Sequence, residues 1–314
     1  MTTAEANVGL AAPTTGAVRR RTGSRPLLTA VLTAVAVVVA AAFILPALWI
    51  LVGSFRPTED ILSTMSPLSW QLFVPTQVTV DNYTRLLLDS GFSRALLNSA
   101  FVCVASVLVG LLVSAMAAYT LAVYRFPGRN LVFALVVISF MVPFEAIAIP
   151  LSQQFISWGL GNTLVGLILP GIGNGLAVFN LRQYFLGIPT SYREAAMLDG
   201  ASEPRILFGL YLRISGPALT NSAVLIFLGQ WTAYLWPLLV ISDSRLQLAP
   251  VALASTFGER SADYGQNFAG TVLLALVPAI SMLVLQRFFG RLSLTSGEKL
   301  PPVRGPDPAP GRPG

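Results

Sequence analysis

The sequence predicts an all-α integral membrane protein with six transmembrane helices and both termini in the cytoplasm. Apolar residues make up 54% of the 314 residues, and charged residues only 11%, against about 25% in soluble domains. The mean hydropathy is +0.70, and several long stretches carry no charge at all. So few charges could not solvate a globule of this length, which argues strongly against a soluble enzyme.

The expected spans are the charge-free stretches, because a membrane helix needs about 20 mostly apolar residues. They cover about residues 27–52, 95–123, 131–150, 163–181, 217–241 and 268–287. The first is too long for the roughly 7–15-residue apolar region of a signal peptide, so we expect a retained span. The polar segment Ser152–Asn162 is the expected turn between the third and fourth spans.

The stretch 61–80 is also free of charge but is predicted to be an outer loop. It carries Pro67 and Pro75 among many polar residues, and irregular backbone is not tolerated against lipid. The basic residues give the orientation, because Arg and Lys gather on the cytoplasmic side. With the N-terminus inside, the only basic residues outside are Arg56, Arg85, Arg94, Arg245 and Arg260. The predicted organisation is a disordered basic tail (1–25), a transmembrane domain (26–290) and a Pro-rich cytoplasmic tail (291–314).

Composition also excludes several kinds of site. The chain has no histidine and one cysteine, Cys103, inside an apolar run. A disulfide framework, a Cys/His metal site and a histidine-dependent triad are therefore excluded within the chain. The net charge of +6 reflects the membrane orientation, so no nucleic-acid partner is expected.

The cytoplasmic segment 187–216 is too long and too patterned for a bare connector. Pro189 ends the preceding structure, and Ser191 with Glu194 is predicted to form a capping box for a short helix from Tyr192 to about Asp199. Gly200 supplies a left-handed stop.

Ser202 is predicted to cap a second helix. Its apolar face would carry Ile206, Leu207, Leu210 and Tyr211. Ala195 and Ala196 keep the tip of this helix–Gly–helix element slim enough to enter a groove on another protein. On physical grounds alone, an amphipathic hairpin that lies on the bilayer is equally compatible with the pattern.

The segment Glu194-Ala195-Ala196-Met197-Leu198-Asp199-Gly200-Ala201 resembles the EAA loop of ABC-importer inner-membrane permeases. The neighbouring residues resemble the carbohydrate-uptake, maltose-permease-like branch of that family. Further matching segments lie in order along roughly residues 45–290: Asp81-Asn82-Tyr83, Asn98-Ser99, Arg125-Phe126-Pro127-Gly128-Arg129, Met141-Val142-Pro143-Phe144, Leu181-Arg182-Gln183-Tyr184-Phe185, Trp236-Pro237 and Gln286-Arg287-Phe288-Phe289. The chain departs from the usual pattern at Leu207, at Arg213 and in Trp231-Thr232-Ala233-Tyr234.

The resemblance implies a type I ABC-importer permease fold in a bacterial cytoplasmic membrane. It implies that the EAA loop is a coupling helix, formed by Pro189, Ser191, Glu194, Ala195, Ala196, Asp199, Gly200 and Ala201, which docks on a cytoplasmic ATPase. The implied partners are a homologous second permease, an ATP-binding-cassette ATPase dimer, an extracytoplasmic solute-binding protein and a sugar substrate. ATP and Mg²⁺ would be bound by the ATPase, since this chain has no Walker A loop and is expected not to be an enzyme.

Polar residues inside the expected spans are candidates for the solute path. Glu145 is the only acid expected at membrane depth, where an exposed charge costs at least about 2.5 kcal/mol. Amide and indole side chains suit sugars but also join membrane helices. The candidates are Glu145, Asn174, Asn221, Gln230 and Trp231, with Asn180 as a further amide. For each, the alternative is a structural hydrogen bond between helices.

These observations predict a permease that translocates a sugar or oligosaccharide by alternating access. An importer for glycerol 3-phosphate or a polyol is the alternative within transport, although a phosphate would favour Arg in the path. An ATP-independent channel would not need the slim helix–Gly–helix tip. A membrane enzyme should show clustered acids or histidines near one interface, and this chain does not.

Overall fold

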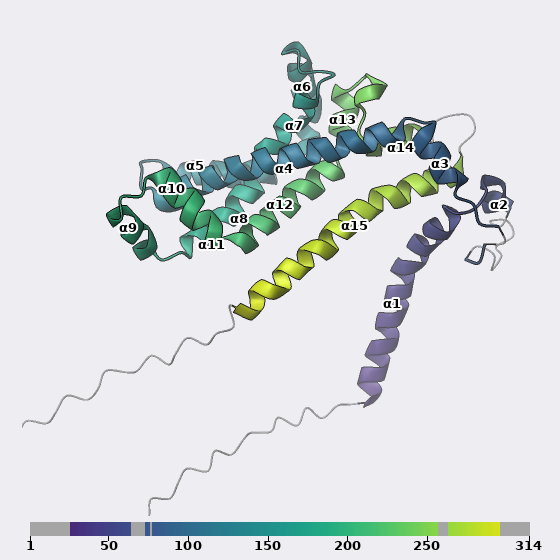
Figure 1. Cartoon of the computed structure of the whole chain (residues 1–314), viewed down its shortest axis with the longest axis horizontal. Coiled ribbons are helices and arrows are strands. Elements are labelled where there is room, and N and C mark those ends of the chain that lie inside the picture. The colour runs from purple at the N-terminus through teal and green to yellow at the C-terminus, as the bar shows by residue number, and fades with distance from the viewer. Residues whose placement is uncertain (1–25, 64–72, 76, 257–262, 296–314) are drawn as a thin grey trace, which may run out of the picture. The chain divides into compact units, whose positions relative to one another are not determined.

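The computed structural model describes residues 26–63, 73–75, 77–256 and 263–295, and this part of the chain contains helices and no strand. The chain divides into two compact units, Met1–Leu48 and Trp49–Gly314. The first contains most of helix α1 (Pro26–Gly53) (Figure 1). Both expected terminal tails, apart from residues 291–295, and part of the expected outer loop 61–80 lie outside the described residues.

The second unit contains the remaining helices. In chain order they are α2 (Thr58–Ser63), α3 (Asp81–Leu88), α4 (Phe92–Val123), α5 (Arg129–Met141), α6 (Phe144–Ser157), α7 (Leu164–Ile172), α8 (Gly175–Leu186), α9 (Thr190–Leu198), α10 (Glu203–Ile206), the π-helical turn η2 (Leu207–Tyr211), α11 (Leu212–Ile214), α12 (Gly216–Trp231), α13 (Leu235–Val240), the 3₁₀ turn η3 (Ser244–Leu246), α14 (Ala249–Thr256) and α15 (Tyr264–Thr295).

Helix α4 is the centre of this unit and packs against α7, α8 and α12 (Figure 1). Its buried face is a stripe of small residues at helical spacing: Ser99, Cys103, Ser106, Gly110, Ser114 and Ala118. Small side chains let membrane helices approach closely. At Gly110 the approach is so close that a Cβ would lie 3.1 Å from the carbonyl oxygen of Gly171 in α7. Cys103 is part of this packing, as its apolar surroundings predict.

Four described helical segments are long and apolar enough to cross a membrane: Leu27–Gly53, Phe92–Val123, Leu164–Leu186 and Tyr264–Val284. Two further segments are bent pairs. One joins α5 to α6, and the other joins the arm Glu203–Ile214 to α12. If each pair provides one span, the described chain reaches six, the predicted number.

The third expected span, residues 131–150, is wrong as one straight helix. Helices α5 and α6 meet at an angle of 97°, because Val142 is extended and Pro143 forms the N-cap of α6. A residue before proline is driven out of the helical region, and proline has no N–H to continue the ladder. The expected turn lies within Ser152–Asn162, as predicted, but occupies only the second half of that segment, because α6 continues to Ser157. Ser152 lies inside α6, and the left-handed residues that turn the chain are Gly159 and Asn162.

The fifth expected span, residues 217–241, is also interrupted. Helix α12 ends at Trp231, and α13 begins at Leu235. Pro237 lies in the first turn of α13, where its missing N–H costs nothing, whereas a continuous helix would place its ring against the carbonyl of Ala233. At the C-terminal end, α15 continues to Thr295, past the expected end at residue 287 and into the expected tail.

Candidate functional site

A short helical tip, residues 189–206, lies at the C-terminal end of α4. Helix α9 ends in a Schellman motif. The N–H of Gly200 donates to the carbonyl of Met197, and the N–H of Ala201 donates to that of Ala196, each at 3.0 Å. Gly200 has φ +78°, a conformation that glycine adopts without steric cost. The predicted left-handed stop is therefore confirmed.

The predicted capping box is wrong. Helix α9 begins at Thr190 with Pro189 at the N-cap, and no side chain caps it. Ser191 is consequently already inside the first turn and cannot accept from the N–H groups ahead of it. Ser202 is the N-cap of α10, as predicted, but its hydroxyl makes no cap hydrogen bond. Ile206, Leu207 and Tyr211 are buried on one face, with Leu210 packed beside them, as the periodicity predicts.

The outer surface of the tip is exposed and partly apolar. Glu194, Ala195 and Asp199 are exposed, whereas Ala196 packs against the buried cluster below. Leu198 is 89% exposed. An apolar side chain presented on a slim tip is typical of a surface that a protein partner covers. The sequence analysis did not single out Leu198, although its position between Ala196 and the Gly200 stop was a usable signal.

A hydrogen-bonded network fastens the tip to α4. Arg193 on α9 donates to Glu203 Oε1 on α10, and the hydroxyl of Tyr119 on α4 donates to Glu203 Oε2 at 2.5 Å. The bond from Arg193 holds the pKa of the Glu203 carboxyl below its usual range and raises the pKa of the Arg193 guanidinium. The Arg193 guanidinium also lies 5.8 Å from the centroid of the Tyr124 ring.

Aromatic packing surrounds this network. The ring of Tyr119 meets those of Tyr211 and Phe185 edge-on, with centroids 4.9 and 6.5 Å away. Such edge contacts are favourable beyond simple burial. The sequence analysis missed the network because Tyr119 is far from Glu203 along the chain, and no local pattern links the two.

The last carbonyls of α4 are satisfied by two arginines. Arg129 donates through Nε to the carbonyl of Leu121 at 2.7 Å, and Arg182 on α8 donates to the same oxygen at 3.1 Å. The Arg182 guanidinium stacks 3.7 Å from the centroid of Phe133. Cations at a helix C-terminus satisfy unpaired carbonyls and complement the helix dipole. These bonds fix the C-terminal end of α4, against which the tip packs.

A cavity of about 540 Å³, here called the central cavity, is lined by residues of α6, α7, α12 and α13. Three of the predicted path residues line it: Glu145, Asn174 and Gln230. Asn174 caps α8 by accepting the N–H of Ala177 at 2.9 Å. The Gln230 amide donates to Ser106 on α4 at 2.7 Å. Both amides therefore have a structural bond and still border the cavity.

The other two path candidates do not line the central cavity. Trp231 is 4% exposed, and its indole N–H donates to the carbonyl of Leu274 on α15 at 3.0 Å. Asn221 is exposed and donates to Asn180 at 3.2 Å, while Asn180 itself bonds α12 through the carbonyl of Ala218. Trp231 and the Asn221–Asn180 pair therefore make hydrogen bonds between helices, the alternative to a place in the solute path.

The central cavity has an aromatic wall that the sequence analysis did not assign. Trp236 donates to the carbonyl of Gly166 at 3.0 Å and meets Phe144 edge-on at 5.7 Å. Tyr234 and Thr232 are exposed beside it. Aromatic faces beside amides and hydroxyls are groups that bind hydroxylated solutes.

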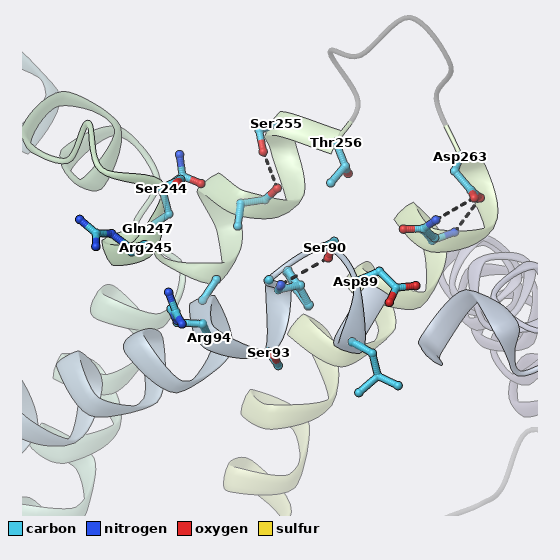
Figure 2. Close-up of a pocket in the computed structure, with 16 residues that line it drawn as sticks. Asp89, Ser90, Ser93, Arg94, Ser244, Arg245, Gln247, Ser255, Thr256 and Asp263 are labelled. Carbon is cyan, nitrogen blue, oxygen red and sulfur yellow. Dashed lines mark hydrogen bonds between the residues drawn. The ribbon is translucent and has the colours of Figure 1, made fainter. Parts of the chain in front are cut away.

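A second cavity, of about 840 Å³, lies at the opposite end of α4. It is lined by the segment from Leu88 to Ala95 and by residues of η3, α14 and the start of α15 (Figure 2). Arg94 and Arg245 lie on one side of this end cavity, and Asp89 and Asp263 on the other (Figure 2). Its mixed charges and open polar rim resemble a protein contact surface more than an enclosed small-molecule site.

The fold and these sites define a multi-pass membrane permease of the type I ABC-importer class. Residues 110–293 match the family described as binding-protein-dependent transport system inner membrane component. The chain belongs to this family, whose members are multi-pass proteins of the plasma membrane.

Relatives and a solved structure agree with this assignment. The chain is 35% identical to the arabinooligosaccharides transport system permease protein AraQ of Halalkalibacterium halodurans, over 84% of this chain and 94% of that protein. It is 35% identical to the sn-glycerol-3-phosphate transport system permease protein UgpE of Pectobacterium atrosepticum, over 66% and 74%. A crystal structure of a bacterial ABC transporter involved in the import of the acidic polysaccharide alginate contains a chain with a TM-score of 0.75 at 21% identity, over 84% of this chain and 97% of that one.

Proposed function

We propose that this chain is one of two membrane subunits of an ATP-driven importer that moves a sugar or oligosaccharide into the cell by alternating access. The observation that carries the proposal is the exposed tip. Glu194, Ala195 and Asp199 surround a left-handed Gly200 stop in a chain of the importer family. The sugar class is supported by the arabinooligosaccharide relative and by the aromatic and amide groups of the central cavity.

The proposed partners are a homologous second permease, an ATPase dimer and an extracytoplasmic solute-binding protein. ATP and Mg²⁺ belong to the ATPase, because the sequence holds no Walker A loop. The tip faces the cytoplasm in this proposal, and the end cavity at the other end of α4 faces the binding protein. The chain itself then performs no hydrolysis and acts as a conformational element.

The coupling step uses groups that the structure places in contact. The ATPase holds the tip at its exposed face, including Leu198. When the ATPase dimer closes, the displacement of α9 passes through Arg193 to Glu203, and from Glu203 to Tyr119 on α4. Helix α4 also contacts Gln230 of the central cavity through Ser106. One rigid helix therefore connects the tip to the cavity.

Glycerol 3-phosphate is the second candidate solute, favoured by the similarity to UgpE. A phosphate site calls for arginine or lysine, and the described lining of the central cavity includes neither. A neutral polyol fits that lining as well as a sugar does. We therefore rank the phosphorylated solute behind the sugar.

The test changes the left-handed residue in two ways. We expect Gly200→Val to abolish recovery of the ATPase in a detergent pull-down, because a β-branched residue at positive φ is strained. No atom lies within 4 Å of the position that a Cβ at Gly200 would take, so the effect comes from the backbone. Gly200→Asn should retain recovery, because asparagine tolerates the left-handed conformation.

Two further variants complete this experiment. Glu194→Lys should lose ATP hydrolysis stimulated by the binding protein. Gly209→Val is the control in the same loop, because Gly209 has ordinary φ and open space around it. The proposal is wrong if Gly200→Val and Glu194→Lys both bind the ATPase and are stimulated normally while the permease pair stays assembled.

A further inference from the structure

One acid in the wall of the central cavity belongs to no ion pair among the described residues. Glu145 lies in the first turn of α6, is exposed, and lines the cavity. Ion pairs in the described chain include Arg85–Asp263, Arg193–Glu203 and Arg245–Asp243. Within that part of the chain Glu145 belongs to none of them. The other acids in these pairs lie at the two ends of α4, whereas Glu145 lies between the ends.

The structure of the third span explains why the acid is there. A straight helix would continue α5 past Met141, but the 97° break at Val142–Pro143 starts a new helix at Phe144. The break therefore places a helix N-terminus at the cavity, with Glu145 in its first turn. The unpaired N–H groups of a first turn stabilise a carboxylate. A carboxylate at this part of the wall therefore lies where the helix dipole favours a negative charge.

The rest of the lining is neutral. The described residues of the cavity wall supply amides from Asn174 and Gln230, a hydroxyl from Thr232 and the aromatic groups of Phe144, Tyr234 and Trp236. Arg182, on the same helix that Asn174 caps, is engaged at the far end by the carbonyl of Leu121 and the ring of Phe133. Glu145 is accordingly the one formal charge among the described lining residues.

We propose that Glu145 gives this half of the solute path a negative potential, so that the path admits uncharged or cationic sugars and opposes anionic ones. The selection among sugars rests on the proposed import function. The negative potential at the cavity wall does not depend on that function. A fixed charge in a cleft with low-dielectric walls is screened less than one in open water. The carboxylate also accepts hydrogen bonds from hydroxyl groups and has none to donate. It therefore suits a neutral sugar and repels a phosphate or a uronate.

The potential can be measured without knowing the solute. Thr232→Cys places a thiol on the exposed cavity wall. This thiol is reacted, in the assembled importer with cysteine-free partners, with two methanethiosulfonates: a trimethylammonium-ethyl reagent, which is a cation, and a sulfonatoethyl reagent, which is an anion. The ratio of the two reaction rates, cation to anion, reports the local potential. The chain without an added cysteine gives the background reaction, because its single cysteine, Cys103, is buried. A second reporter, Ser255→Cys, lies on the wall of the end cavity.

We expect Glu145→Gln to lower the cation-to-anion rate ratio at the Thr232→Cys thiol about tenfold, the size of effect expected when two probes differing by two unit charges meet one partly screened carboxylate. Glu145→Asp should keep the ratio, and the Ser255→Cys ratio should not change with either variant. In the chain with native Glu145, raising the ionic strength to about 1 M should collapse the ratio, because the Debye length falls to about 3 Å. The inference is overturned if Glu145→Gln leaves the cation-to-anion rate ratio at the Thr232→Cys thiol unchanged. If Glu145→Gln does not assemble, the inference is overturned when the same ratio in the chain with native Glu145 does not change with salt.

A transport arm separates this inference from the proposed function. The probes are arabinotriose and its aldonate, which differ by one carboxylate at equal chain length. In the chain with native Glu145 we expect uptake of the neutral sugar to exceed uptake of the aldonate. Glu145→Gln should narrow the ratio of the two uptake rates about threefold, because these probes differ by one unit charge and the thiol reagents by two. A thiol ratio that depends on Glu145, together with no uptake of either sugar, supports the charged cavity and counts against the sugar function. Equal discrimination in both chains, with uptake intact, overturns the selection by Glu145.

Discussion

The tip and the central cavity handle charge in opposite ways. At the tip, the partly buried carboxylate of Glu203 accepts hydrogen bonds from Arg193 and Tyr119. In the cavity, Glu145 is exposed and belongs to no described ion pair. A paired charge fixes the relative position of helices, whereas an unpaired charge remains available to a ligand. In the proposed function, this difference suits a tip that transmits force and a cavity that meets a solute.

The largest effect should come from the exposed apolar residue of the tip. Leu198→Ser should weaken recovery of the ATPase about 10- to 100-fold, because covering a leucine side chain contributes about 1.5–3 kcal/mol. The fold should be unaffected, since Leu198 is 89% exposed. The matched control is Leu88→Ser, which changes a 79% exposed leucine at the other end of α4. Equal recovery for both variants would show that the tip surface is not the docking face.

The next prediction sets the two carboxylates against each other. Glu203→Gln should lower the free energy of unfolding in detergent by about 1–2 kcal/mol, because charge-assisted hydrogen bonds to Arg193 and Tyr119 are weakened. Glu145→Gln should change it by less than about 0.5 kcal/mol, as is usual for an exposed side chain without partners. Denaturant titration of the purified complex measures both values. A larger loss for Glu145→Gln would reverse the comparison.

A smaller effect is expected at the end of the network on α4. Tyr119→Phe keeps the ring contacts with Tyr211 and Phe185 and removes only the hydroxyl that donates to Glu203. We expect a loss of about 1 kcal/mol in stability and a larger proportional loss of transport per ATP hydrolysed. A loss of stability with normal coupling would make the hydroxyl merely structural. Gln230→Glu is not a substitute control here, because it adds a charge to the cavity.

The smallest effect concerns pH. The pKa of Glu203 is held below its usual value of about 4.3 by Arg193. A carboxyl with a depressed folded-state pKa stabilises the fold above its unfolded pKa, and this contribution is lost as pH falls through the folded pKa. The difference in stability between the parent chain and Glu203→Gln should therefore stay constant from pH 8 to about pH 5.5. It should shrink below about pH 4. A difference that shrinks already between pH 8 and 6 would contradict the assigned pair.

Much of the fold follows from the sequence, because hydropathy reports the length of apolar segments directly. Helices α1, α4 and α15 were found in this way. Hydropathy carries no information on direction, however, so the breaks before Phe144 and Leu235 were missed although Pro143 and Pro237 marked both positions. The left-handed Gly200 was predictable because its signal is local, whereas the starting residue of α9 depended on a competition between Pro189 and Ser191.

The candidate site was predicted only in part. Of the predicted solute-path residues, Glu145, Asn174 and Gln230 line one cavity, and their role in the path stays a prediction. Trp231 belongs to the same polar, aromatic class, but the rotation of α12 turns it toward α15. That rotation is set by packing across the whole bundle. The same reason hid the pairing of Glu203 with Tyr119, whose contact exists only once α4 and the tip are assembled.

The small-residue stripe of α4 has a mechanical consequence. Alanine and glycine have no side-chain rotamers to exchange and serine is short, so a helix that moves against these residues meets few interlocking side chains. A stripe of leucines would interlock, and each step of sliding would require unlocking and repacking. We therefore expect the face of α4 from Ser99 to Ala118 to shift against its neighbours with little repacking of side chains. The hydrogen bonds of Ser99 with the N–H of Ala249 and of Ser106 with Gln230 would be what holds the helix in one position.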